Sequence, residues 1–156
     1  MTRVLATGTF DILHPGHLRY LEEAKKLGDE LWVIVARESN IKHKPKPIMP
    51  EKHRLKMISA LKIVDRAILG SKKDMFEPLR KIKPDIITVG ADQHFDVGEL
   101  EAELKKRGIN AKVVRIKGYD PDPLCSSGKI IKRVAERYDT KFKETKKRWR
   151  LWNLKP

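Results

Sequence analysis

Thiol chemistry and long apolar runs are nearly absent from this chain of 156 residues. Its one cysteine, Cys125, cannot form an intramolecular disulfide, so we expect a reducing compartment, the cytoplasm. Whether Cys125 is a reactive thiol or an inert filler stays open. No stretch approaches the roughly 18 consecutive apolar residues of a membrane-spanning helix. The first residues lead straight into a strand pattern, and we expect neither a secretory signal nor a membrane partner.

Acidic residues are also scarce relative to basic ones. The chain has 35 Lys and Arg against 21 Asp and Glu, a formal net charge of +14. Part of the excess lies in residues 139–156, which also hold two of the three tryptophans. Such a field attracts nucleic acids as well as small phosphorylated ligands. Two interpretations of this basic segment stay open: it binds nucleic acid, or its tryptophans pack against the rest of the protein or against a partner subunit. A nucleic-acid-binding protein is therefore one hypothesis.

Short apolar runs alternate with segments of helical periodicity along the chain. Strands are expected at 4–6, 31–36, 67–69, 85–90 and 112–116, and helices at 15–27, from Pro50, at 74–82, 98–107 and 128–138. The helix from Pro50 is expected to bury Leu55, Ile58, Leu61 and, as a candidate, Met57. This alternation predicts an α/β fold, a Rossmann-like doubly wound parallel sheet of about five strands in a single domain. We expect the domain to cover 1–138 and a basic, Trp-containing tail to follow at 139–156.

The segment 8–17 links the first strand to the first helix and holds the chain's most informative pattern. His14 and His17 lie three residues apart around a Pro-Gly turn, so both rings point to the same side of a helix start. Helix N-termini bind anions through unpaired N–H groups. The segment therefore predicts a phosphate site, with the backbone at Thr9 and Phe10 as a cradle. The alternative is a histidine pair satisfied by local hydrogen bonds. No third ligand follows at a suitable spacing, so a protein-held metal is not expected.

Basic side chains follow the second strand. Of the lysines in the loop at 39–50, Lys44 and Lys46 are the candidates for neutralising a triphosphate. Arg54, one turn into the next helix, either joins them or forms a salt bridge with Glu51. Asp11 either takes part in the site or ties the turn together.

Two further loops are expected at the same edge, outside the carboxyl ends of the strands. Asp92 follows the fourth strand and holds a ribose hydroxyl, positions a divalent cation, or caps the next helix. Ser126 and Ser127 precede the last helix and either cap it or form a second anion site. Four loops that converge on one edge favour a nucleotide-using enzyme.

The pattern G-T-F-D followed by H-P-G-H resembles the nucleotidylyltransferase superfamily, whose H-x-G-H signature opens the first helix of a Rossmann-like fold. Residues 125–130 match in part a second signature that is rich in Ser and Thr, with Gly128 where many members carry a hydroxyl. The likeness covers roughly residues 2–136.

Two subgroups of this superfamily are similar to the chain. G-T-F-D-I-L-H-P-G-H, P-E-K-H-R and V-G-A-D resemble glycerol-3-phosphate cytidylyltransferase, which uses CTP. Those stretches together with L-W-V-I-V-A-R, I-M-P-E, R-A-I-L-G-S, K-P-D-I-I-T-V-G-A-D-Q and R-I-K-G-Y resemble archaeal FAD synthase. We prefer the second because its likeness runs through strands and loops. It implies an enzyme that uses Mg²⁺ and transfers AMP from ATP to FMN, and members commonly form homodimers.

The resemblance also implies roles for individual residues. His14 and His17 would stabilise the transition state, with Lys44 or Lys46 on the phosphates. The remaining nucleotide contacts would be Thr9, Phe10, Asp92, Tyr119, Ser126 and Ser127.

Overall fold

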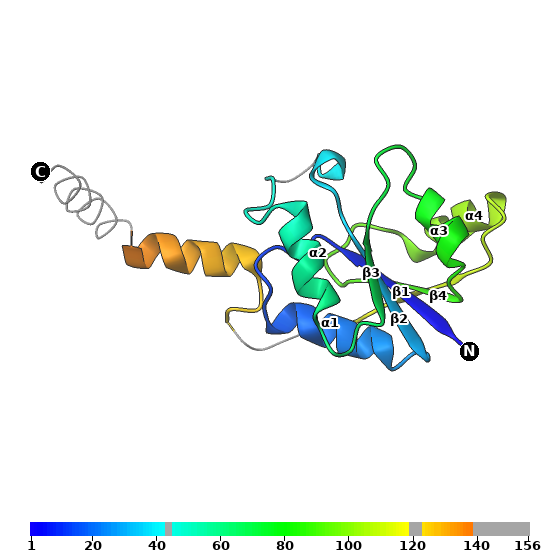
Figure 1. The fold of residues 1–156 in the computed structure, drawn as a ribbon, viewed down its shortest axis with the longest axis horizontal. Helices are drawn as coiled ribbons and strands as arrows, with labels where there is room; N and C mark the ends of the chain where they lie inside the picture. The colour runs from blue at the N-terminus through cyan, green and yellow to red at the C-terminus, as the bar shows by residue number, and fades with distance from the viewer. Residues whose placement is uncertain (43–44, 119–122, 139–156) are drawn as a thin grey trace, which may run out of the picture. The chain divides into compact units, whose positions relative to one another are not determined.

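A parallel sheet of five strands, in the order β3-β2-β1-β4-β5, organises the protein (Figure 1). The computed structural model describes residues 1–42, 45–118 and 123–138. The elements in chain order are β1 (Arg3–Gly8), α1 (Pro15–Lys25), β2 (Glu30–Val35), a short 3-10 helix η1 (Glu38–Asn40), α2 (Glu51–Ser59), β3 (Arg66–Leu69), α3 (Glu77–Ile82), β4 (Ile86–Val89), α4 (Val97–Lys106) and β5 (Lys112–Arg115). The predicted doubly wound sheet is confirmed.

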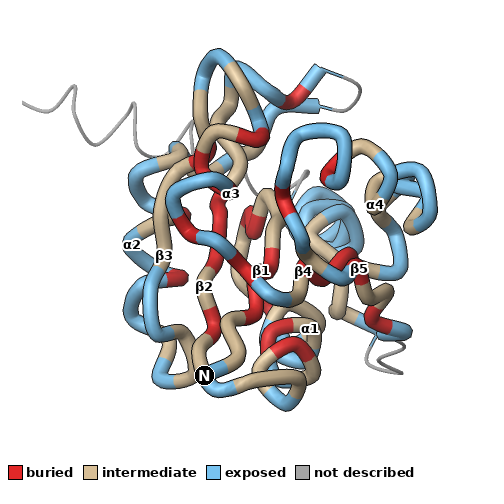
Figure 2. Tube along the Cα trace, turned by 90° about the vertical axis from the view of Figure 1, so that its right-hand side faces the viewer, coloured by how far each residue is buried: buried red, intermediate tan, exposed pale blue. Residues whose placement is uncertain are grey.

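Both faces of the sheet are apolar because successive side chains of a strand point to opposite sides. In β1, Val4 and Ala6 belong to one buried cluster and Leu5 belongs to the other. In β2, Val33 and Ile34 divide in the same way. Figure 2 shows buried residues along the central strands. Continuous apolar runs in the sequence therefore become strands that are covered on both faces.

Each face is covered by its own pair of helices. Helices α1 and α2 contribute Leu21, Ala24 and Ile58 to the cluster that contains Val4. Helices α3 and α4 contribute Leu79 and Leu104 to the opposite cluster. This arrangement follows from the strand order. The connections from β1 to β2 and β3 run across the sheet in one direction and those from β3 to β4 and β5 run in the other, so right-handed crossovers place their helices on opposite faces.

The strand order reverses between β1 and β4. These two strands are neighbours in the sheet, with Val4 beside Ile86 and Ala6 beside Thr88, although more than 80 residues separate them. From β1 the chain continues to β2 and β3 on one side, and from β4 it continues to β5 on the other. Ligands of doubly wound sheets bind at such a reversal, outside the carboxyl ends of the strands. The loops that follow β1 and β4 flank this point.

Two details differ from the sequence prediction. Helix α3 begins at Glu77, not at 74, because Asp74 first forms a turn and Pro78 then occupies the first helical turn, where its missing N–H costs nothing. Met57 is 52% exposed and does not belong to the buried stripe of α2. It is one residue from Ile58, and adjacent helical positions point in different directions.

Contacts divide the chain into two units, Met1–Asp120 and Pro121–Pro156. In the second unit, residues 127–138 are helical, and the Ile130 amide donates to the Ser126 carbonyl at 3.0 Å. The helix predicted at 128–138 is therefore confirmed. The expected domain boundary after residue 138 stays a prediction, and the basic tail at 139–156 lies outside the described residues. Among the helices described, none has the length and apolar character needed to cross a membrane.

Candidate active site

The loop between β1 and α1 leads into a helix start that no side chain caps. His14 is the residue before the first helical turn, with an extended backbone (φ −143°, ψ 168°) and no side-chain cap. Its carbonyl accepts from the amides of His17 and Leu18, at 3.0 and 3.3 Å. Pro15 starts the helix, and the first turn contains no acidic residue. The positive end of the helix dipole is therefore not neutralised locally, as an anion site requires.

His14 and His17 lie face to face. Their ring centroids are 3.7 Å apart with an interplanar angle of 26°. The Nδ1 atom of His17 is buried and has no hydrogen-bond partner, so local hydrogen bonds do not satisfy this histidine. Burial, reinforced by the neighbouring His14, lowers the pKa of His17 to about 4 against the opposing effect of Asp11. His17 is therefore neutral at pH 7, with one N–H donor and one acceptor.

An aromatic column supports the histidine pair. The Phe10 ring lies 5.4 Å from that of His17, in an edge-to-face arrangement, and 6.4 Å from that of Tyr20. The Tyr20 hydroxyl lies 3.0 Å from both the carbonyl and the Oγ1 atom of Thr88 on β4, and burial raises the pKa of Tyr20 to about 12. A Cβ atom at Gly8 would lie 2.8 Å from the Phe10 ring, so glycine is required there. The column connects the loop between β1 and α1 to β4, the strand next to β1.

The same loop carries backbone strain. Phe10 and Ile12 have φ angles of 54° and 48°, the left-handed region that side chains other than glycine rarely occupy. Phe10 is 5% exposed, and its packed ring holds the backbone in this conformation. Strain of this kind is typical of functional sites.

Asp11 ties this loop to the segment that precedes α2. Its carboxylate accepts from the amides of Ile48 and Met49, at 2.7 and 2.9 Å. These contacts support the structural interpretation of Asp11. They also connect the histidine loop to the lysine-containing loop across 37 residues of sequence.

Arg54 is 1% exposed and organises three segments at once. Its guanidinium donates to the carbonyls of Thr9 (2.6 Å), Ala36 (2.9 Å) and Met49 (2.9 Å). The salt bridge with Glu51 that the sequence left open is wrong, because Glu51 pairs with Arg37 at 3.0 Å. The Nη2 atom of Arg54 is buried without a hydrogen-bond partner. Arg54 thus holds the backbone of the loop between β1 and α1 through the Thr9 carbonyl.

Of the two candidate lysines, Lys46 is described and Lys44 lies outside the described residues. The Lys46 ammonium donates to the carbonyls of Glu38 and Ile41, at 2.6 and 2.8 Å. An ammonium group has three N–H donors, so these two bonds close the loop and leave one donor for an anion.

The loop after β4 is held by two residues that the sequence analysis missed. Gln93 accepts from the Gly90 amide at 2.8 Å and donates to the Thr7 carbonyl of β1 at 3.1 Å. Arg115 on β5 donates to the carbonyls of Gly90 and Gln93, both at 3.0 Å, and to the carbonyl of Phe95. An arginine that follows two valines at the carboxyl end of β5 was the available signal.

Asp92 is exposed on this loop. Helix α4 is capped by Asp96, whose carboxylate accepts from the Glu99 amide at 2.9 Å. The alternative in which Asp92 caps the helix is therefore wrong.

The remaining candidates lie near or beyond the end of the first unit. Tyr119 falls outside the described residues. Ser126 and Ser127 belong to the second unit, where they open the helix at 127–138, and Cys125 before them is partly exposed. Their predicted contacts with a nucleotide stay predictions. Within residues 1–42, 45–118 and 123–138, no three His, Cys, Asp or Glu side chains gather as a metal site would require.

We expect the fold to lose stability as the pH falls from about 6.5 to 4, through His17. Its pKa is about 4 in the folded chain and 6.5 when unperturbed, so protons bind the unfolded chain more tightly. The stabilisation is fully present above pH 6.5 and disappears as the pH approaches 4. By pH 4.5 the loss amounts to roughly 2–3 kcal/mol. Urea unfolding of the wild type and His17→Gln measures it, because the variant cannot titrate there. A stability difference between them that does not change with pH would contradict this assignment.

Comparisons with known proteins identify the family of this chain. Residues 5–133 match the family model described as cytidylyltransferase-like. The chain belongs to the cytidylyltransferase-like family.

Its similar relatives are more specific. The FAD synthase of Archaeoglobus profundus is 61% identical over 144 residues, 92% of this chain and 93% of that protein. The FAD synthase of Methanosarcina mazei is 67% identical over 138 residues, 88% of this chain and 91% of that protein. Among solved structures, the lipopolysaccharide core biosynthesis protein of Thermoplasma volcanium is 56% identical, with a TM-score of 0.74 over 77% of this chain and 99% of that one.

Proposed function

We propose that this protein is an FMN adenylyltransferase, an FAD synthase that transfers AMP from ATP to FMN and releases pyrophosphate. The observation that carries the proposal is identity of 61% and 67% to FAD synthases over most of both chains. The H-P-G-H segment lies beside the reversal of strand order in this family's fold, where ligands of doubly wound sheets bind. The resemblance identified from sequence points to the same reaction.

The chemistry is a displacement at the α-phosphorus of ATP. A phosphate oxygen of FMN forms a bond to this phosphorus, and the bond from the phosphorus to the bridging oxygen of pyrophosphate breaks. No covalent intermediate with the protein is needed, so catalysis consists of positioning and electrostatic stabilisation. His14 and His17 donate to the phosphate oxygens on which charge grows. A neutral His17 supplies its donor without a desolvation penalty for a buried cation.

The nucleotide is held by backbone and basic groups of the same edge. The amides around Thr9 and Phe10 and the first turn of α1 cradle phosphate oxygens. Lys46, together with Lys44, neutralises the triphosphate. Asp92 contacts the nucleotide ribose.

The residues before the last helix complete the proposed nucleotide contacts. Ser126 and Ser127 bind the triphosphate of ATP, as the resemblance implies, and Tyr119 is a further nucleotide contact. The base is selected in this part of the chain, by hydrogen bonds to adenine.

Magnesium enters with the nucleotide in this proposal. Phosphate oxygens are the hard ligands that Mg²⁺ prefers, so the phosphates of the nucleotide would hold the ion, and Asp92 is the one candidate carboxylate if it positions the cation and not the ribose. The ion would supply positive charge to the phosphates.

Two further properties follow from the family resemblance and the composition. We infer that the protein is a homodimer that acts in the cytoplasm, the second because its single cysteine suits a reducing compartment. Sedimentation equilibrium across a range of concentrations measures the first.

One set of incubations tests the proposed function. The purified protein is mixed with Mg²⁺, with ATP or CTP, and with FMN or glycerol 3-phosphate, and the products are separated by chromatography. We expect FAD from ATP and FMN, and no product from the other three combinations. A cytidylylated glycerol phosphate would instead favour the cytidylyltransferase subgroup. Absence of any product, together with salt-sensitive RNA or DNA binding that His14 and His17 substitutions leave unchanged, would favour the nucleic-acid hypothesis.

A further inference from the structure

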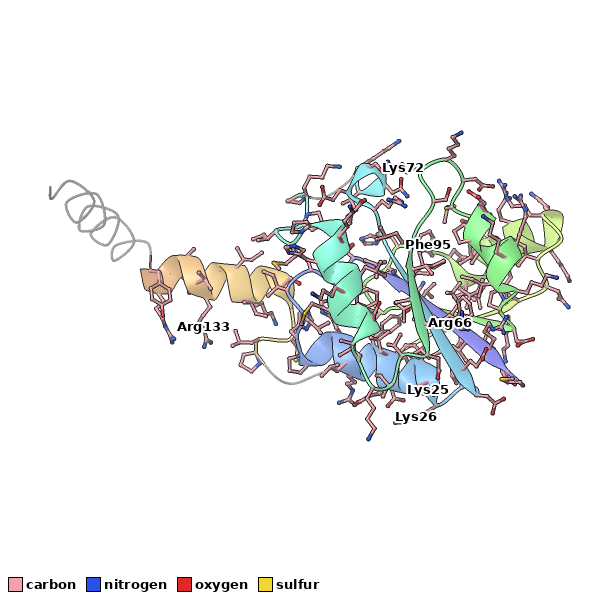
Figure 3. The ribbon with its side chains drawn as sticks, in the orientation of Figure 1. Lys25, Lys26, Arg66, Lys72, Phe95 and Arg133 are labelled. Carbon is pink, nitrogen blue, oxygen red and sulfur yellow. The ribbon has the colours of Figure 1, made fainter. Side chains whose placement is uncertain are left out.

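Phe95 is an aromatic side chain that the hydrophobic core does not use. It is 40% exposed on the segment between β4 and α4 (Figure 3). Other rings of residues 1–118 are already engaged: Phe10 and Phe76 are buried, and Trp32 lies under the guanidinium groups of Arg3 and Arg66 at 5.1 and 5.3 Å. Among the described residues of this range, Phe95 is the one Phe, Tyr or Trp in the exposed class. Two-fifths of the surface of this residue is therefore accessible to a ligand.

The backbone that carries Phe95 is fixed from two sides. The Phe95 carbonyl accepts from the guanidinium of Arg115, which also holds the carbonyls of Gly90 and Gln93. From the other side, the Gln93 amide reaches the Thr7 carbonyl of β1. These hydrogen bonds hold the loop, and with it the backbone of Phe95, in one conformation. A preorganised ring binds a planar ligand with little loss of conformational entropy.

The position of this loop points to the substrates. It follows β4, and the histidine loop follows β1, so the two loops leave the sheet on either side of the reversal of strand order. The hydrogen bond between Gln93 and Thr7 joins them directly. Adjacent strands lie only about 4.8 Å apart. Phe95 therefore belongs to the same substrate edge as His14 and His17.

We propose that Phe95 is the stacking platform for the isoalloxazine ring of FMN, held in place by Arg115 and Gln93 as positioning residues. This inference rests on the proposed function and names the acceptor side of its site. The dimethylbenzene end of isoalloxazine has no hydrogen-bonding group, so an apolar side chain is what can bury it. Adenine, in contrast, carries ring nitrogens and an amino group that polar contacts recognise. Stacked rings prefer the offset arrangement that an exposed phenyl group permits.

Equilibrium binding of FMN alone tests the platform without relying on turnover. We expect Phe95→Ala to raise the Kd for FMN about tenfold, in line with the loss of one stacked ring. The KM for ATP is expected to stay within about twofold, since the variant keeps every side chain proposed to contact the nucleotide, Asp92 on the same loop included. The matched control is Met57→Ala, an exposed apolar residue on α2 that belongs to no part of the site. Isothermal titration calorimetry gives the Kd and steady-state kinetics gives the KM values.

A second variant supplies a signal that a structural role would not produce. Phe95→Trp keeps a stacking ring, and an indole in contact with isoalloxazine quenches flavin fluorescence. We expect FMN bound to this variant to be quenched more strongly than FMN bound to the wild type, with affinity retained. Thermal melts of all variants show whether each one folds, and Phe95→Leu replaces Phe95→Ala if the latter does not.

The outcomes separate this inference from the proposed function. If the wild type makes no FAD, the proposed function fails. If it makes FAD and Phe95→Ala binds FMN as the wild type does, the platform is wrong while the function stands. If Phe95→Ala raises the KM for ATP and leaves the Kd for FMN unchanged, the ring belongs to the adenine site and the proposal is overturned.

Discussion

His17→Ala is expected to lower kcat for FAD formation by roughly 100- to 1,000-fold while the fold survives. The ring stacks on His14 and on the edge of Phe10, and its Nδ1 atom has no protein partner. The substitution therefore removes ring contacts but breaks no hydrogen bond of Nδ1 within the protein. The KM values for ATP and FMN are expected to change much less than kcat, because the donor acts chiefly on charge that develops in the transition state. Steady-state kinetics with both substrates varied measures the effect.

The control for this prediction is another histidine. His53→Ala removes an exposed ring from α2, and we expect it to keep wild-type kinetics. Circular dichroism confirms that both variants fold. Normal turnover in well-folded His17→Ala would remove the catalytic role of this histidine and weaken the whole assignment.

Arg54→Met is expected to destabilise the protein by roughly 3–5 kcal/mol. Methionine fills a similar length but donates no hydrogen bond, so the carbonyls of Thr9, Ala36 and Met49 lose their donors in a buried place. Burial lowers the pKa of the guanidinium, and the carboxylate of Asp11 opposes that effect, so the cation is compensated where it lies. Urea unfolding monitored by circular dichroism gives the difference in free energy of unfolding.

A lysine on the same helix is the matched control for Arg54. Lys52→Met also replaces a basic side chain with methionine, but position 52 is exposed, and we expect a change within about 0.5 kcal/mol. A similarly small effect of Arg54→Met would show that the three carbonyls find other donors, and that the arginine does not organise the loop.

The fold was predictable because its signals are local. The run 31–36 is apolar on both alternating positions, and in the structure Val33 and Ile34 face opposite clusters. That pattern needs no knowledge of the rest of the chain. The predicted helix boundaries were less accurate where a turn competes with the helix. At Asp74, the carboxylate accepts from the Phe76 amide and the carbonyl accepts from the Glu77 amide before α3 begins.

The site was predictable only where its residues are close in sequence. His14 and His17 lie three residues apart at the start of α1, directly after the loop that follows β1, and this local spacing places both rings on one side. Arg54 was recognised as a candidate, but its actual partners, the carbonyls of Thr9 and Ala36, lie 45 and 18 residues away.

Long-range polar contacts of single residues leave no periodic signature. Gln93 reaches Thr7 across 86 residues, and the Tyr20 hydroxyl reaches Thr88 across 68. Such pairs become visible only once the strand order is known, because β1 and β4 are neighbours in space and remote in sequence. The supporting residues of a site on a doubly wound sheet are therefore the part that sequence reasoning misses.

The left-handed backbone conformations of Phe10 and Ile12 have different consequences for the stability of this protein. Each such residue costs of order 1–3 kcal/mol relative to a relaxed conformation. Glycine would relieve this strain at position 12, where the side chain is only partly buried. At position 10 glycine would also remove a buried ring that packs against His17, and the loss of such a ring from a core costs about 3–5 kcal/mol, more than the strain. Position 12 is therefore open to stabilisation by glycine, whereas position 10 keeps its strained phenylalanine because the packed ring outweighs the strain.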